Sequence, residues 1–475
     1  MSNFSFDPFT EASPLELSQL NKGQVQAYDN IIAFLEDVSH DMFLLEGYAG
    51  TGKTFLVSKI IDYISFKHPR WKIAATAPTN KAVKVLEAAG KISSHAVTFM
   101  TIHRLLGLSE EITDEGKQIF VQKSMDRNTI DDYDVIVVDE VSMLNDELFK
   151  DLCKYSPRIK IIFMGDPAQI PPVGKTDCIP FVAEERDKYK IKMALLTEIM
   201  RQNESNPIVQ ASFTIRNNLY QQHLDLPLYT NINDQGHGID FIDLSKLENK
   251  DKMQLLVKQY FDCDAFRENA DHAKFIAWRN VIIDGLNDRI RKIIHKKDVL
   301  DKILIGEKLI ADKPVVDTFA GGIIFQTNSE FEVIKFEVKK KGVRLSSGDH
   351  YQFQCYDCTV QYIDNEITLQ KNIQIIHEDD QDYFEKISNK VKEHAIRSTF
   401  TARKFAWKEY YRFINTFARV KYNYAITAHK SQGSTYTNVF VMNSDLDKNS
   451  NVYERNRIKY TAFTRAAEKL FIIKN

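Results

Sequence analysis

The stretch Gly47-Tyr-Ala-Gly-Thr-Gly-Lys-Thr54 decides the fold class of this 475-residue chain. It fits the pattern GxxxxGK[ST], in which glycines let backbone N–H groups approach phosphate oxygens closely. An apolar run, MFLLEG (42–47), precedes it, and a helical pattern, TFLVSKIIDYISFKH (54–68), follows it. The positive end of the helix dipole then faces the phosphates. We predict a strand, a phosphate-binding loop and a helix, with Lys53 on the β- and γ-phosphates and Thr54 on Mg²⁺.

Three more short apolar runs lie in the first half of the chain: KIAATAPT (72–79), DVIVVDE (134–140) and KIIFMGD (160–166). They lack the alternation of a half-exposed strand, which favours strands buried on both faces of a parallel sheet. A helical pattern, NKAVKVLEAAG (80–90), follows the first of them. This alternation of strands and helices predicts a doubly wound α/β domain.

Polar residues follow two of these runs. In VIVVDEVSM (135–143), Asp139 and Glu140 come directly after four apolar residues. A phosphate loop needs an acid at the end of a neighbouring strand, so we predict that Asp139 binds Mg²⁺ and Glu140 activates the attacking water. In GDPAQIPP (165–172), Gln169 either contacts the γ-phosphate or lies in a proline-rich turn that closes a strand.

The segment SEEITDEGKQIFVQK (109–123) breaks the α/β rhythm. Two alternating runs flank Asp114-Glu115-Gly116, which predicts a β-hairpin that projects from the first domain. A second α/β pattern includes HAKFIAWRN (272–280) with the helix after it, and it resumes in three strand-like runs, KYNYAIT (421–427), TNVFVMNS (437–444) and KLFIIKN (469–475).

Between these pieces apolar and polar residues alternate with a period of two. This pattern predicts a small antiparallel barrel of SH3-like type. Two helical stretches, near 381–397 and 401–418, follow it. The predicted domains are a first α/β domain (1–204, with the hairpin inserted at 107–131), a second α/β domain (205–300 and 416–475), and an insertion (301–415).

Composition indicates a globular protein that is not secreted. Hydrophobic residues make up 43% of the chain, and no apolar stretch approaches the ~20 residues that span a bilayer. The N-terminus has no basic start followed by an apolar run. Five scattered cysteines form no disulfide framework, so we expect a reducing cytoplasm, of a bacterial or phage-infected cell. Cys355 and Cys358 form a CxxC that we interpret as structural rather than as a zinc or redox site.

Charge is uneven along the chain. The formal net charge is −2, yet residues 390–475 hold 17 Lys and Arg against 6 Asp and Glu. Such a segment is either a solvated face or a surface that binds nucleic acid. The KKKG turn (339–342) could likewise contact phosphate or be a solvated hairpin tip, and we favour the solvated tip.

The three motifs GYAGTGKT, DEVSM and GDPAQIPPV, in this order and spacing, resemble motifs I, II and III of superfamily 1 DNA helicases. The resemblance is greatest to the Dda- and RecD-like 5′-to-3′ branch, including the phage Dda type. It extends from Gln24 to the C-terminus and includes LNKGQ (20–24), APTNKA (77–82), TIHRLL (101–106), LTEIMRQ (196–202), AITAHKSQGST (425–435) and YTAFTRA (460–466).

The resemblance implies a nucleotide site in a cleft between two RecA-like domains. In it, Gln24 contacts the adenine, and Arg201 and Arg465 reach the γ-phosphate when the cleft closes. The predicted catalytic residues are Lys53, Asp139, Glu140, Gln169, Arg201 and Arg465. The predicted nucleotide-binding residues are Gln24, Gly47, Ala49, Gly50, Thr51, Gly52, Lys53, Thr54, Phe55, Gln169, Arg201, Gly433 and Arg465.

The resemblance also implies a path for single-stranded DNA across both α/β domains. Hydroxyl and imidazole groups suit phosphate contacts without base readout, and aromatic rings suit stacking on bases. Three residues keep an alternative: His103 as a cap or core residue, Trp278 as core, and Phe120 as a packed aromatic instead of a wedge. The predicted DNA-binding residues are Pro78, Thr79, Asn80, Thr101, His103, Phe120, Trp278, Asn287, Thr427, His429 and Lys430.

Together these features predict an ATP-dependent DNA helicase, with ATP and Mg²⁺ as cofactors, acting in replication, recombination or repair. The expected partners are single-stranded DNA, junctions of single- and double-stranded DNA, and proteins of replication or recombination, but no membrane. We expect a monomer. Movement from 5′ to 3′ rests on the resemblance alone. The alternatives are an ATPase stimulated by single-stranded DNA that remodels protein–DNA complexes, and a binding module with a decayed motor. The intact motif residues argue against the second.

Overall fold

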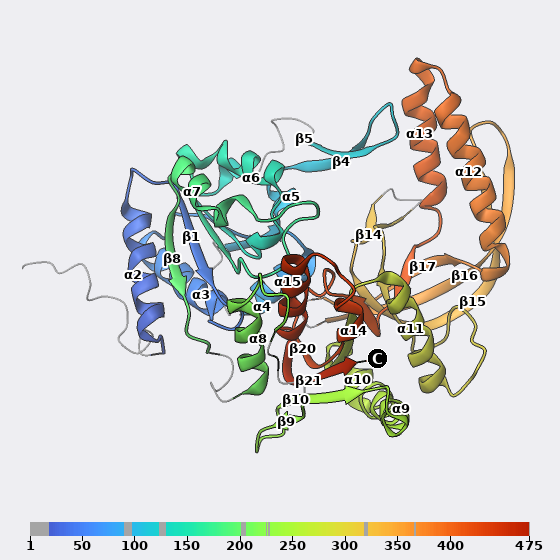
Figure 1. Cartoon of the computed structure of the whole chain (residues 1–475). Helices are drawn as coiled ribbons and strands as arrows, with labels where there is room; N and C mark the ends of the chain where they lie inside the picture. The colour runs from blue at the N-terminus through green and yellow to red at the C-terminus, as the bar shows by residue number, and fades with distance from the viewer. Residues whose placement is uncertain are drawn as a thin grey trace, which may run out of the picture.

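The computed structural model describes residues 19–89, 97–122, 130–200, 206–224, 226, 229–317, 322–364 and 367–474. Its first half is built on a six-stranded parallel sheet with the order β3-β2-β6-β7-β1-β8 (Figure 1). The strands are β1 (Met42–Gly47), β2 (Ile73–Ala77), β3 (Val97–Thr101), β6 (Val135–Val138), β7 (Lys160–Gly165) and β8 (Lys192–Leu196). The four predicted runs are all strands, and β3 and β8 are strands that the sequence did not predict.

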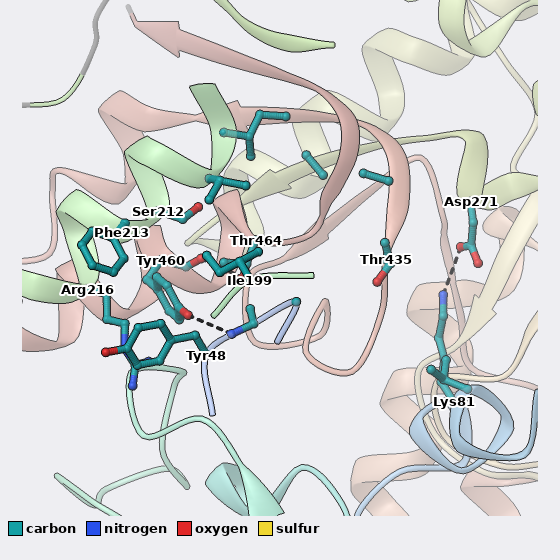
Figure 2. Close-up of a pocket in the computed structure, with 17 residues that line it drawn as sticks. Tyr48, Lys81, Ile199, Ser212, Phe213, Arg216, Asp271, Thr435, Tyr460 and Thr464 are labelled. Carbon is teal, nitrogen blue, oxygen red and sulfur yellow. Dashed lines mark hydrogen bonds and ion pairs between the residues drawn. The ribbon is translucent and has the colours of Figure 1, made fainter. Parts of the chain in front are cut away.

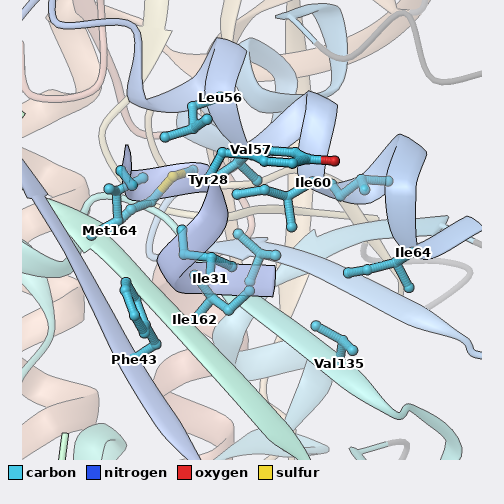
Figure 3. Close-up of a cluster of buried hydrophobic side chains, with 14 of the residues drawn as sticks. Tyr28, Ile31, Phe43, Leu56, Val57, Ile60, Ile64, Val135, Ile162 and Met164 are labelled. Carbon is cyan, nitrogen blue, oxygen red and sulfur yellow. The ribbon is translucent and has the colours of Figure 1, made fainter. Parts of the chain in front are cut away.

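Helices cover both faces of this sheet. They are α2 (Lys22–Glu36), α3 (Lys53–Lys67), α4 (Asn80–Ala89), α5 (Ile102–Leu105), α6 (Asp146–Cys153) and α7 (Ala183–Tyr189). Figure 3 shows the core on one face, where Ile31 of α2 and Ile60 of α3 meet Phe43 and Ile162 of the sheet. All four side chains are at most 1% exposed. This packing fixes the start of α3, and therefore Lys53, at the carboxyl end of β1.

The predicted hairpin is present. Strands β4 (Leu108–Ile112) and β5 (Gln118–Gln122) pair antiparallel and project from the first domain toward the insertion (Figure 1). Gly116 closes the turn with a φ of +77°, a value that glycine adopts at no steric cost. Its N–H donates to the carbonyl of Thr113 at 2.9 Å.

The second α/β domain has a mixed sheet with the order β19-β11-β20-β21-β10-β9. Its strands are β9 (Asn231–Ile232), β10 (Gly238–Asp243), β11 (Ala273–Ala277), β19 (Ala425–Thr427), β20 (Tyr436–Met442) and β21 (Ala466–Lys474), and only the pair β10–β9 is antiparallel. Its helices are α8 (Pro207–Asn217), α9 (Leu247–Phe261), α10 (Asp264–Glu268), α11 (Asn280–His295), α14 (Asn443–Leu446) and α15 (Val452–Phe463). The fold is therefore the predicted pair of RecA-like domains.

The insertion contains a five-stranded antiparallel sheet with the order β17-β16-β15-β12-β18. Its strands are β12 (Lys308–Ala311), β15 (Glu330–Arg344), β16 (His350–Asp364), β17 (Ile367–Ile376) and β18 (Val420–Tyr422), beside the small pair β13 (Val315–Val316) and β14 (Ile323–Phe325). Helices α12 (Gln381–Arg397) and α13 (Phe400–Ile414) form a hairpin on this sheet. The SH3-like character of the insertion stays a prediction.

One sequence prediction needs correction here. The run KYNYAIT (421–427) was expected to be one strand of the second α/β domain, but the structure divides it. Val420–Tyr422 pairs with β12 in the insertion, whereas Ala425–Thr427 pairs with β11 in the second domain. The intervening Asn423 is buried, and the chain crosses between the two sheets there. Among the described residues, no helix is both long enough and apolar enough to cross a membrane.

The segment after β7 leaves the first sheet and enters the second domain. Ala168 and Ile170 belong to the same buried cluster as Ile239, Ile276 and Val439 of the second domain. The two α/β domains are therefore joined through this segment by apolar packing as well as by polar contacts.

Candidate nucleotide site and nucleic-acid interface

The loop between β1 and α3 has the shape of a phosphate-binding loop. Gly50 and Gly52 adopt φ values of +82° and +77°, which side-chain-bearing residues rarely reach. A Cβ at Gly47 would come within 2.8 Å of the Thr51 hydroxyl, so the loop is too tight for a larger residue there. The N–H groups of the first turn of α3 have no carbonyl partner within the helix. They are the donors that a phosphate needs.

Lys53 lies inside this loop. Its Nζ donates to the carbonyls of Gly47 at 2.8 Å and Tyr48 at 3.0 Å. Burial lowers the pKa of the Lys53 ammonium, while the carboxylates of Asp166, Glu140 and Asp139 act in the opposite direction. A cation among three carboxylates at the carboxyl edge of a parallel sheet is suited to hold phosphate and a divalent metal.

Gln24 is tied to the loop by its side chain, and its contact with the adenine stays a prediction. Its backbone N–H donates to the Asn21 Oδ1 at 2.7 Å, and its own Oε1 accepts the Asn21 N–H at 3.1 Å. The Gln24 Nε2 donates to the Thr51 carbonyl at 3.0 Å, and the side chain is 1% exposed. Phe55, which the sequence also assigns to the nucleotide, is 37% exposed on α3.

The two predicted acids follow β6. Asp139 is buried and accepts the N–H of Glu140 at 2.7 Å. Glu140 has a φ of +52°, in the left-handed region that a non-glycine residue rarely occupies. Backbone strain of this kind costs about 1–3 kcal/mol and is concentrated at functional sites. The strain supports a specific role for Glu140 beside the loop.

Two further predicted residues lie at the seam between the domains. The Oε1 of Gln169 is buried and has no hydrogen-bond partner among the described residues. Gly433 of the second domain has a φ of +71°, and a Cβ there would lie 3.2 Å from Ala82 and 3.8 Å from Glu140 of the first domain. The site thus combines the N–H donors of the loop, the carboxylates of Asp139 and Glu140, and the unsatisfied amide oxygen of Gln169. This set of groups fits a nucleoside triphosphate with Mg²⁺.

A pocket of about 380 Å³ lies between the loop and the second domain. Tyr48, Ala49 and Gly50 line it from the first domain, and α8, α15 and the start of β21 line it from the second. Figure 2 shows Arg216, Tyr460 and Tyr48 gathered at one end, with Lys81 and Asp271 at the other. Its lining is mainly apolar.

The sequence missed three residues that bridge this seam. Arg216 of α8 pairs with Asp166 after β7, and its guanidinium lies 3.7 Å from the centre of the Tyr48 ring. Tyr460 of α15 donates to Asp166 at 2.6 Å. Arg457, 1% exposed, donates to carbonyls of the 167–177 segment. Only Tyr460 lies inside a quoted motif, so it alone had a sequence signal.

The two predicted arginines of the nucleotide site have different outcomes. Arg465 is 5% exposed and donates to the carbonyls of Thr461 at 3.0 Å and Ser434 at 2.9 Å, so it links YTAFTRA to AITAHKSQGST. Its neighbours Thr464 and Ala466 line the pocket. Arg201 lies outside the described residues.

On the first domain, the predicted DNA contacts lie at the carboxyl ends of β2 and β3. The Thr79 hydroxyl accepts the N–H of Ala82 at 3.2 Å, and the Thr101 hydroxyl accepts that of Arg104 at 3.4 Å. Both hydroxyls thus cap helices, α4 and α5, while Pro78 and Asn80 flank the first cap. Their contact with DNA stays a prediction.

His103 and Phe120 meet each other. Their ring centres lie 4.6 Å apart, which places the hairpin directly over the TIHRLL segment. Burial lowers the pKa of His103, so its imidazole is mainly neutral near pH 7. Phe120 stays 57% exposed, as a residue that contacts a partner must be.

The hairpin tip rests on the insertion. Ile112 packs against a cluster that contains Trp407 of α13, and the Tyr411 hydroxyl donates to the Gly116 carbonyl at 2.8 Å. A Cβ at Gly116 would meet the Trp407 ring at 2.3 Å, so the tip and the ring are in close contact. The hairpin is therefore held at its tip and midway along its second strand.

On the second domain, Thr427, His429 and Lys430 follow β19. The Thr427 hydroxyl accepts the Lys430 N–H at 3.3 Å, and the Lys430 Nζ pairs with Asp312 at 3.1 Å. Burial lowers the pKa of His429. Trp278 is half-buried against the second-domain core, so stacking on a base stays a prediction.

Asn287 was predicted to bind DNA, and the structure contradicts this. It is 2% exposed, its Nδ2 donates to the Ala425 carbonyl at 3.2 Å, and its Oδ1 accepts the N–H groups of Tyr424 and Ala425. Its amide is used up in holding α11 to β19. Residues at the exposed end of a strand and residues on the buried face of the next helix lie close together in the sequence. A motif match therefore does not tell which of them face the DNA and which face the core.

The CxxC on β16 divides between two cores. Cys355 packs in the cluster with Phe353 and Phe384, and Cys358 packs with Val333 and Tyr356. Both thiols are free, and burial raises the pKa of Cys358 to about 12. The two thiols point away from each other, which suits the structural interpretation.

Fold and site define a P-loop enzyme with two RecA-like domains. Residues 19–230 match the model of an AAA domain, and residues 422–473 match the UvrD-like helicase C-terminal domain. The chain is 30% identical to the uncharacterized protein R530 of Acanthamoeba polyphaga mimivirus, over 95% of this chain and 99% of the relative. It is 26% identical to the ATP-dependent DNA helicase dda of Enterobacteria phage T4, over 97% and 100%.

A third relative is the RecBCD enzyme subunit RecD of Buchnera aphidicola, 24% identical over 93% of this chain and 71% of the relative. The chain belongs to the superfamily 1 helicases of the Dda and RecD type.

Proposed function

We propose that this chain is an ATP-dependent DNA helicase that moves 5′ to 3′ on single-stranded DNA and unwinds the duplex ahead of it. The observation that carries this proposal is the placement of Lys53 among Asp139, Glu140 and Asp166, at the seam between two RecA-like domains. A phosphate loop at such a seam can convert nucleotide turnover into relative movement of the domains.

The residues of the first domain divide the chemistry among them. The loop and Lys53 would hold the phosphates, and Thr54 and Asp139 would hold Mg²⁺. When bound, Mg²⁺ neutralises charge that develops on the phosphates. Glu140, fixed by its left-handed backbone, would orient the attacking water and accept its proton. Gln169, whose buried Oε1 has no partner among the described residues, would contact the γ-phosphate.

The second domain completes the site. Gly433 approaches Glu140, and Arg465 holds the AITAHKSQGST segment in place beside the pocket. An arginine that reaches the transferred phosphoryl group is worth about 10³–10⁵ in rate, so its arrival can gate hydrolysis on closure of the domains. We assign that role to Arg465 and Arg201.

The hairpin supports unwinding over translocation alone. It is anchored midway along its second strand by the His103–Phe120 contact and at its tip by Trp407, while Phe120 stays 57% exposed. A fixed hairpin can resist the approach of a base pair, whereas a loose one would bend away. The proposed ligands are single-stranded DNA and forked DNA.

The test compares ATP hydrolysis with and without single-stranded DNA for the wild type and Lys53→Ala. We expect strong stimulation by DNA in the wild type and a fall of roughly 10²–10³-fold in the variant, the range for removal of one group that stabilises transition-state charge. Hydrolysis that ignores DNA, or none, would overturn the helicase assignment. Unwinding of a 5′-tailed but not a 3′-tailed duplex then tests direction.

An ATPase that remodels protein–DNA complexes without unwinding is the second candidate. It would show the same DNA-stimulated hydrolysis, so the tailed duplexes decide between the two. Unwinding of neither duplex, together with displacement of a bound protein from single-stranded DNA, would favour this candidate.

A further inference from the structure

The segment that follows Asp166 belongs to the first domain in sequence, but its beginning, residues 167–170, packs against the second domain. Arg457 fixes it there, since its guanidinium donates to the carbonyls of Gln169 at 2.7 Å, Pro167 at 2.5 Å and Thr176 at 2.5 Å. Ala168 and Ile170 lie in the second-domain core. Residues 167–170 are therefore held to the second domain, whereas Cys178 further along the chain lies in the core of the first domain.

Asp166 stands where the segment leaves the first sheet. It is fully buried, and both of its carboxylate oxygens are used. Oδ1 accepts from Arg216 and from the Ala168 N–H at 3.0 Å. Oδ2 accepts from the Tyr460 hydroxyl at 2.6 Å and from the Ala49 N–H at 2.9 Å. One carboxylate thus joins the phosphate loop to two side chains of the second domain.

The loop has further ties to the same side chains. The Ala49 N–H also lies 3.2 Å from the Tyr460 hydroxyl, and Arg216 stacks on the Tyr48 ring. If the second domain moved away, Asp166 would lose the Arg216 guanidinium and the Tyr460 hydroxyl and keep the Ala49 N–H, with Lys53 and Glu46 still nearby. Loss of two buried donors from a carboxylate is unfavourable, so the loop would have to rearrange to supply others.

We infer that Asp166, Arg216 and Tyr460 are positioning residues that set the conformation of the phosphate loop at Tyr48 and Ala49 according to where the second domain stands. The inference rests on the proposed function. Its consequence there is that closure of the two domains changes the conformation of the phosphate loop through Asp166.

Tyr460→Phe is the sharpest probe, because it removes only the hydroxyl that binds Asp166 and Ala49 and keeps the ring. Tyr453→Phe is its matched control. Tyr453 lies on the same helix, and its hydroxyl lies 3.2 Å from Asp177 and 3.3 Å from Arg457 at the same seam, away from the loop. Both variants lose one hydroxyl that contacts an aspartate across the seam.

We expect two changes in Tyr460→Phe that are absent in Tyr453→Phe. The dissociation constant for ADP, measured by calorimetry, rises about 3- to 10-fold, and kcat/KM for ATP with single-stranded DNA falls about tenfold, as for loss of a hydrogen bond to a charged group. Wild-type values in Tyr460→Phe would overturn the inference. Equal losses in both variants would also overturn it, because the role would then be general support of the seam.

A second pair of variants keeps the test decisive if Tyr460→Phe does not fold. Arg216→Lys retains a cation beside Asp166 and Tyr48, whereas Arg216→Met does not. Affinity for ADP closer to wild type in Arg216→Lys than in Arg216→Met supports the inference, and equal affinities contradict it. ADP binding needs no DNA, so failure of the proposed helicase activity would be visible separately, as absence of DNA stimulation in the wild type.

Discussion

The first half of the molecule touches the rest at two very different places. At the seam beside the phosphate loop, Asp166 is fully buried, Arg457 is 1% exposed, and Ala168 and Ile170 pack in the core of the opposite domain. At the hairpin tip, the contact consists mainly of Gly116 under Trp407 and one hydrogen bond from Tyr411, while Phe120 on the second arm stays exposed.

The difference shows how one chain separates two tasks. The seam is charged, buried and continuous with a core, so a change there reaches both stability and the nucleotide site. The hairpin contact is small and lies at the end of a long arm. A change there should therefore affect only the activity that depends on the hairpin, which is unwinding. Variants at each place test this division.

The largest effect is expected from Arg457→Met. It leaves the carbonyls of Pro167, Gln169 and Thr176 without their buried donor, which should lower the free energy of unfolding by roughly 2–4 kcal/mol. DNA-stimulated ATP hydrolysis should fall with it. Urea denaturation and steady-state hydrolysis measure the two effects.

Arg455→Met is the control for this variant. Arg455 is also buried on α15, but its guanidinium donates to the Gln222 carbonyl, within the second domain. We expect Arg455→Met to lower stability with little loss of DNA stimulation. If the two variants lost hydrolysis to the same extent, the seam would have no role in hydrolysis beyond its contribution to stability.

The next effect is expected from Gly116→Ala. Its methyl group would strike the Trp407 ring at 2.3 Å, and overpacking costs about 1–3 kcal/mol, enough to release the hairpin tip. We expect unwinding of a tailed duplex to fall about tenfold while ATP hydrolysis stimulated by single-stranded DNA is retained. Rapid-quench unwinding assays and steady-state hydrolysis on the same preparation measure both.

Gly236→Ala provides the matched control. Gly236 has a φ of +78°, almost the same as Gly116, but a Cβ there meets nothing within 4 Å. Both variants carry the same backbone strain of about 1 kcal/mol, and only Gly116→Ala disturbs the tip. Loss of unwinding in both would assign the effect to strain instead of to the contact with Trp407.

The smallest effect is expected at a third contact, where Lys81 of α4 pairs with Asp271 at 3.1 Å and Glu330 at 2.8 Å. Burial raises the pKa of Glu330, but Lys81 and Lys274 outweigh it and hold that pKa at about 2. A lowered carboxyl pKa gives stability that is present above the unfolded value near 4.5 and is lost as the pH falls toward 2.

Lys81→Met should therefore lower the free energy of unfolding by about 1 kcal/mol at pH 7, and the difference from wild type should shrink as the pH falls below about 4.5. Urea denaturation between pH 3 and pH 7 measures this. A difference that stays constant across that range would mean that Glu330 does not titrate with Lys81.

The contrast between the two contacts also explains what the sequence could predict. The β1–loop–α3 unit and the hairpin are local, so glycines at fixed spacing and alternation around Gly116 were enough. Lys53, Asp139 and Glu140 came from motifs within short segments, and the structure brings them together. The edge strands β3 and β8 were missed, because their residues are only partly buried and their apolar pattern is weak.

Long-range partners could not be predicted in this way. Arg216, Arg457 and Tyr460 reach Asp166 and its neighbours over some 50 to 294 residues of sequence, and nothing local marks a buried arginine as a bridge. Asn287 failed for the opposite reason. The side of the helix on which it lies faces the core, which a motif match does not reveal.

The placement of Ala168 and Ile170 has a practical consequence for dividing the chain. A fragment that ends near residue 204 would retain the whole parallel sheet, yet it would expose these two side chains and strand the carbonyls that Arg457 now satisfies. Such a fragment should be prone to aggregate, whatever the quality of its own core. The boundary drawn along the sequence is therefore not a boundary at which the protein can be cut.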